Sequence, residues 1–143
     1  MTAKSPLARA DTRLRSAALL FGAGLTVHTV DHLRRGTDEI TRHVFWGGMA
    51  LTAMSVIAIA LVLRRHPAAP LVATAVGFTA AIGVSAAHLL PEWSTALSDS
   101  LPSGNVDTLS WAAVLIEITG ALALGLAGAA ALRHPHHEAV PAR

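Results

Sequence analysis

The chain has 143 residues, of which 52% are hydrophobic and 14% are charged, and its formal net charge at pH 7 is +2. Soluble domains carry about 25% charged residues, so this composition indicates a single domain whose solvent is lipid. The absence of cysteine excludes disulfides, thiolate ligands and iron–sulfur clusters. Nothing in the distribution of charge indicates a nucleic-acid partner.

Four apolar stretches follow one another, and each is close to the roughly 20 residues that a membrane-spanning helix needs. We expect spans at about 14–34, 43–63, 70–90 and 109–132. They make residues 14–132 a membrane domain between two polar tails, 1–13 and 133–143. Short connections between them predict an all-α integral membrane protein, folded as an antiparallel four-helix bundle.

The first stretch follows basic residues, as a signal peptide would. It continues through His28 and Asp31 to Arg34 without a small-residue cleavage site, so we interpret it as a retained span. Pro91 ends the third stretch. In the long connection that follows, residues 91–101 are expected to form a short interfacial helix with Trp93, Leu97 and Leu101 on one side. Asp107 or Thr108 is expected to cap the fourth span.

Lysine and arginine are unevenly divided between the two sides of the predicted bundle. Eight of the eleven lie in or beside the tails and the 64–69 loop, which share one side. The positive-inside rule therefore predicts a multi-pass protein of the cell (cytoplasmic) membrane with both termini in the cytoplasm. The three tryptophans fall on the opposite, outer rim, as an interfacial aromatic belt would.

Ionisable residues inside the apolar stretches are the main functional signal, because they are costly in a bilayer. His28, Asp31 and His32 are spaced i, i+3 and i+4 near the outer end of the first stretch, so they share one helix face. His88 lies near the outer end of the third stretch. Glu117 lies about 15 Å inward in the fourth. Antiparallel topology brings all five into the outer half of the bundle.

Imidazoles and carboxylates together match the ligands of Zn²⁺, Fe or Cu. We therefore predict a divalent metal site, and its candidate ligands are His28, Asp31, His32, His88 and Glu117. The three histidines are also the candidate ligands of a haem. Glu117 and Asp31 are the candidate catalytic groups, since a positioned carboxyl can act as a general base or proton carrier.

Four interpretations follow from this cluster. The leading one is a membrane metalloprotein that acts on a lipid or small amphiphile, by hydrolysis with a metal-bound water or by redox chemistry. The alternatives are a haem b or quinone electron carrier with His28 or His32 facing His88, a proton-coupled small transporter using Glu117 and His28, and a non-catalytic accessory subunit with a purely structural cluster. A homo-oligomer or larger membrane complex is compatible with each.

Other polar residues have simpler interpretations. His43 is expected to reach the membrane interface. Glu92 is expected to be an exposed loop charge, with a place at the site as the alternative. The tail residues His134, His136 and His137 are expected to be solvated.

Overall fold

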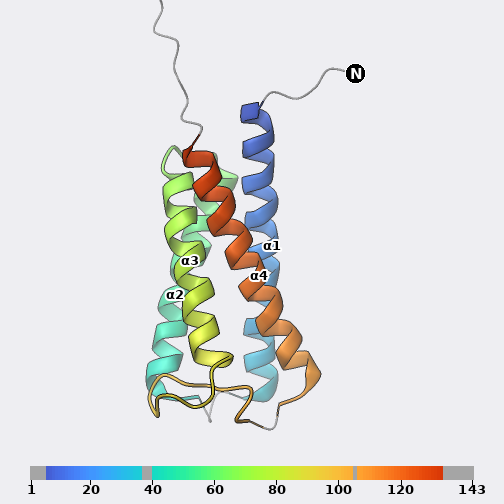
Figure 1. Ribbon diagram of the computed structural model, residues 1–143, viewed down its shortest axis with the longest axis vertical. Coiled ribbons are helices and arrows are strands. Elements are labelled where there is room, and N and C mark those ends of the chain that lie inside the picture. Colours follow the sequence, from blue (N-terminus) through green and yellow to red (C-terminus); the bar gives the residue numbers. More distant parts are fainter. Residues whose placement is uncertain (1–5, 37–39, 105, 134–143) are drawn as a thin grey trace, which may run out of the picture.

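The computed structural model describes residues 6–36, 40–104 and 106–133. These residues form four helices: α1 (Pro6–Arg35), α2 (Arg42–Leu63), α3 (Ala69–His88) and α4 (Thr108–Leu132). The prediction of an all-α chain is confirmed for this part of the chain. Figure 1 shows the helices running alternately up and down.

The bundle has two distinct ends (Figure 1). The start of α1, the connection at 64–68 and the last turn of α4 lie at one end, here called the terminal end. The last turn of α1, the start of α2 and the α3–α4 connection lie at the other, here called the loop end. Both ends of the helical part of the chain therefore lie on the same side.

Three of the helices, α2, α3 and α4, are long and apolar enough to cross a membrane, judged by length and composition. Helix α1 is not among these three helices, because His28, Asp31 and His32 interrupt its apolar stretch. Large apolar side chains nevertheless cover the outside of all four helices, with Leu19 of α1 60% exposed and Ile82 of α3 70% exposed. A surface of this kind suits lipid rather than water.

The helix starts follow local sequence signals. Pro6 stands at the first position of α1, where its missing N–H costs nothing. Residues 6–13, placed by the sequence in a polar tail, are thus the first turns of α1. The side chains of Thr41 and Asp107 cap α2 and α4 by accepting a hydrogen bond from the backbone N–H of the third residue of each helix. The predicted cap at Asp107 is confirmed.

Glycines set the close approach of α1 to α4. A Cβ atom added to Gly24 would lie 2.7 Å from the Cα of Glu117, and one added to Gly120 would lie 2.7 Å from the Cα of Phe21. The two backbones are therefore in direct contact, as small residues allow in membrane helices. Since α4 also packs closely on α3, it fixes the positions of both neighbours.

Helix α2 is held differently from the other three. Its fully buried residues, Ser55, Ala58 and Val62, all lie in its second half, toward the terminal end. Its contacts with α3 and α1 are less extensive than those that α4 makes. The first half of α2 consequently stands off from its neighbours at the loop end.

The α3–α4 connection differs from the prediction, because residues 91–101 form turns rather than a helix. The Ser98 hydroxyl accepts from the N–H groups of Trp93 and Ser94, and the Ser94 hydroxyl accepts from those of Ala96 and Leu97. These local bonds offer the backbone an alternative to helical ones. Leu101 of this connection is buried, whereas Trp93 and Leu97 are exposed.

Candidate metal centre at the loop end

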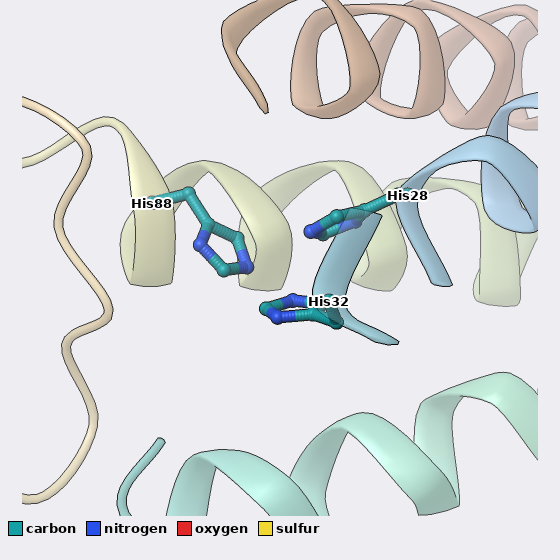
Figure 2. Close-up of side chains that lie close together, drawn as sticks. All are labelled: His28, His32 and His88. Carbon is teal, nitrogen blue, oxygen red and sulfur yellow. The ribbon is translucent and has the colours of Figure 1, made fainter. Parts of the chain in front are cut away.

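Three histidines from two helices meet at the loop end. His28 and His32 project from one face of α1, and His88 comes from the last turn of α3. The ring centroids lie 4.6 Å apart for His28 and His32, 4.8 Å for His28 and His88, and 5.5 Å for His32 and His88. Figure 2 shows His28 and His88 with a ring nitrogen turned toward each other, and His32 beside both.

The spacing of the ring nitrogens suits a single metal ion. One nitrogen from each ring lies within 4.8 Å of the other two. With metal–nitrogen bonds of about 2.0–2.1 Å, the nitrogens of a tetrahedral site lie roughly 3.4 Å apart. Small ring rotations would therefore bring the three histidines onto one ion.

The two ring nitrogens of His28 have different surroundings. Nδ1 pairs directly with Oε2 of Glu117 from α4, and both side chains are buried. Nε2 is also buried, and it is the one such side-chain nitrogen or oxygen without a hydrogen-bond partner among the residues described. A carboxylate that accepts from Nδ1–H leaves the lone pair of Nε2 available for a metal.

His88 is oriented in the same way by Asp99 of the α3–α4 connection. Its Nδ1–H donates to the Asp99 carbonyl oxygen at 3.0 Å, and the Asp99 carboxylate lies 3.4 Å from the same nitrogen. The interaction of the His88 ring with the Asp99 carboxylate, helped by the charge of Arg35, lowers the pKa of Asp99 to about 2. Asp99 is therefore ionised at neutral pH, and Nε2 of His88 is left free to bind.

His32 is half-buried, and its Nδ1 accepts a hydrogen bond from Nη2 of Arg35 at 3.3 Å. In that arrangement a neutral ring carries its proton on Nε2. Ligation through Nε2 requires the other tautomer, with the proton on Nδ1. The Asp99 carboxylate, 4.0 Å from Nδ1 of His32, is placed to accept that proton's hydrogen bond after a small shift.

Asp31 lies beside the three histidines but is engaged by arginines. Its Oδ1 accepts from Arg34 at 2.7 Å and its Oδ2 from Arg35 at 3.1 Å. Arg34 continues to Asp107 at 2.9 Å and to Ser110 at 3.2 Å. This network fastens the last turn of α1 to the start of α4, and it occupies both Asp31 oxygens.

The predicted site residues thus divide into two groups. The structure brings His28, His32 and His88 together, with Glu117 against His28. Asp31 stands in the adjacent ion-pair network instead. Glu92 is exposed, and His43 is exposed but lines the cavity beside the three histidines. The tail histidines lie outside the described residues.

Asp99 and Arg35 are partners of the histidines that the sequence did not indicate. Asp99 sits in an irregular connection, where spacing carries no signal about which residue it will face. Arg35 follows the His28–His32 pair by one helical turn, a spacing that could have indicated the contact with His32.

A cavity of about 550 Å³ adjoins the histidines. It lies between α1, α2 and α3, because the first half of α2 stands off from the bundle. The three histidines, His43 and Glu117 supply polar groups, as do Thr29, Thr52 and Thr79. Most of the remaining lining is apolar, including Leu25, Val44, Leu51, Met54, Val84 and Leu97. Its volume falls within the roughly 300–1,000 Å³ of small-molecule sites.

Comparisons with known protein families, with curated proteins and with solved structures found no match to this chain. A fold alone does not imply an activity. The residues of the site therefore carry the evidence for the function.

Proposed function

We propose that the chain is an integral membrane metalloprotein that binds one divalent metal ion, Zn²⁺ first among them, through His28, His32 and His88. The observation that carries this proposal is the buried Nε2 of His28, which has no hydrogen-bond partner and faces the other rings (Figure 2). Leaving such a group unsatisfied costs roughly 1–3 kcal/mol. A bond to a metal removes that cost.

The surroundings of the rings support a metal rather than a purely structural cluster. Metal-binding histidines usually donate their other N–H to a carboxylate or a carbonyl oxygen. His28 has the Glu117 carboxylate in that role, and His88 has the Asp99 carbonyl oxygen. Three imidazoles with an open fourth position are typical of catalytic zinc sites, although imidazole also suits Fe and Cu.

The ring packing favours a single ion over a haem. A haem held by two histidines needs the imidazoles on opposite faces of a flat macrocycle. His28 and His88 instead meet edge to face with centroids 4.8 Å apart, and His32 packs against both. Rings this close leave no room for a macrocycle between them.

The proposed topology has four spans, with α1 as the fourth membrane helix and both termini in the cytoplasm. The exposed Leu19, Leu20, Val27 and Val30 give α1 an apolar outer surface like those of its neighbours. The basic residues gather toward the terminal end. This orientation places the histidines in the outer half of the membrane.

Hydrolysis is the activity that this arrangement supports best. Zinc held by three protein ligands lowers the pKa of its bound water to about 7 and so supplies a nucleophile at neutral pH. The three histidines border the cavity, so a substrate bound there would meet the metal's open position. The bilayer around the bundle makes a lipid or other amphiphile the expected substrate class.

Elemental analysis of the protein purified in detergent tests the metal site. We expect about one metal ion per chain, lost in His28→Ala and in His88→Ala. His66→Ala is the matched control, because His66 is an exposed histidine outside this cluster. Metal content no higher than background, or equal content in all four proteins, would overturn the proposal. The element detected distinguishes zinc from iron and copper.

A further inference from the structure

The cavity beside the histidines has the length of one membrane leaflet. Along α3 its lining runs from His88 inward to Thr79, and along α2 from His43 to Met54. At 1.5 Å per residue these stretches span about 14 Å and about 16 Å. Half of a hydrocarbon core of about 30 Å is about 15 Å. The cavity therefore has the depth that an acyl chain occupies in one leaflet.

The chemistry of the cavity changes along this length. Four histidines of its lining, His28, His32, His43 and His88, stand toward the loop end, and its deeper walls are apolar apart from Glu117 and the hydroxyl groups of Thr52 and Thr79. Trp93 lies at the loop-end rim, where its indole N–H donates to the Ala86 carbonyl oxygen at 2.7 Å. Tryptophan is enriched at the level of lipid head groups. A ligand with a polar head and an apolar tail fits this gradient in one orientation only.

We infer that the cavity binds a single acyl chain of an amphiphile whose carbonyl or carboxylate group lies at the three histidines. This inference rests on the proposed function, since the metal would hold the head-group oxygen and the topology sets the depth. A volume of about 550 Å³, near the middle of the range for one small molecule, favours one chain over a whole two-chain phospholipid.

Two glycines allow the cavity to be filled without disturbing the bundle. A Cβ atom added to Gly48 of α2 would meet nothing within 4 Å, and one added to Gly83 of α3 would meet only the tip of Leu51 at 4.0 Å. Both glycines line the cavity. Leucine at either position would occupy space that the acyl chain needs, and displacing two buried methylene groups weakens binding roughly tenfold.

The test uses the purified full chain and a palmitic-acid analogue that carries a photoreactive diazirine in the middle of its tail. After illumination, mass spectrometry locates the cross-linked residues. We expect cross-links on less exposed cavity residues such as Leu25, Leu51 and Val84, at roughly tenfold lower occupancy in Gly48→Leu and Gly83→Leu when the probe is limiting. Ala53→Leu is the matched control, because Ala53 is exposed on α2 outside the cavity lining.

Cross-links confined to the outer surface of the helices, or cavity cross-links that both leucine variants leave unchanged, would overturn the inference. Metal content measured on the same samples distinguishes a failure of the acyl-chain inference from a failure of the proposed metal site. Cavity cross-links without metal would uphold the acyl-chain site alone. Metal without cavity cross-links would uphold the metal site alone.

Discussion

At the scale of single residues, the contacts of Glu117 favour the role of an orienting residue for His28. One of its oxygens pairs with Nδ1 of His28, and its backbone lies against Gly24 of α1. Both contacts fix the ring of His28 relative to α4. Glu117 is therefore expected to act on the metal through His28, as an orienting residue.

Glu117→Gln should weaken metal binding about 10- to 100-fold, the usual effect of removing a carboxylate that orients a ligating histidine. Glutamine keeps the size of the side chain but removes its charge. The measurement is a competition titration against a chelator of known affinity. Glu92→Gln makes the same change at an exposed residue of the α3–α4 connection and should bind metal like the unaltered protein; equal affinities in both variants would refute the orienting role.

The lowered pKa of Asp99 predicts that its carboxylate contributes to the stability of the fold in a pH-dependent way. Its pKa is about 2 in the folded protein, lowered by the interaction of the His88 ring with the Asp99 carboxylate, against an ordinary aspartate value of about 3.9. Because the folded-state pKa is the lower one, the stabilisation is complete above pH 4 and is lost as the pH falls toward 2. Asp99→Asn should therefore unfold at a lower temperature than the unaltered protein at neutral pH.

Thermal unfolding of both proteins at a series of pH values checks this. The difference in melting temperature should shrink steadily between about pH 4 and pH 2. A difference that stayed constant over that interval would show that Asp99 stabilises the fold without its charge.

At the scale of helices, adding a single carbon atom at the contact between α1 and α4 should destabilise the fold. Gly24→Ala would place a Cβ atom 2.7 Å from the Cα of Glu117, so the two backbones must separate. Overpacking of this kind typically destabilises by about 1–3 kcal/mol. Because the separation occurs at Glu117, metal affinity should fall as well.

Gly47→Ala is the control for Gly24→Ala. It makes the same substitution in a helix where the new carbon meets nothing within 4 Å, and alanine is the better helix former by up to about 1 kcal/mol. Melting temperature should fall for Gly24→Ala and hold or rise for Gly47→Ala. An equal change in melting temperature in the two variants would show that the backbones of α1 and α4 are not in tight contact at Gly24.

The sequence allowed the helices to be predicted better than the contacts between them. The apolar runs and the residues Pro91 and Asp107 indicated where α3 ends and α4 begins, because these signals are local. The antiparallel order indicated that His28, His32, His88 and Glu117 would share one half of the bundle.

The partners of these residues could not be predicted in the same way. The engagement of Asp31 by two arginines depends on rotamers, and the approach of Asp99 to His88 depends on the path of an irregular connection. The turns at 91–101 arise because serine hydroxyls compete for the backbone. The cavity depends on how far α2 stands off, which its uniformly apolar sequence does not reveal.

At the scale of the whole molecule, the proposed topology can be tested with single cysteines, because the chain has none of its own. Thr95 is exposed on the α3–α4 connection and His66 is exposed on the 64–68 connection, at opposite ends of the bundle. A membrane-impermeant thiol reagent should label Thr95→Cys in intact cells and His66→Cys only after lysis. The reverse pattern would invert the topology, and labelling of both in intact cells would contradict an odd number of spans between them.

The uneven attachment of α2 has a mechanical consequence. Ala58, fully buried, lies 14 residues from Val44 at the cavity, a lever arm of about 21 Å. Pivoting the helix by about 5° around Ala58 would displace Val44 by roughly 2 Å. At the N-terminal end of α2, the Thr41 hydroxyl donates a hydrogen bond to the Ala96 carbonyl oxygen. Ala96 lies three residues before Asp99 in the α3–α4 connection. Tilting α2 would therefore widen the cavity and pull on the residue that orients His88 in a single movement.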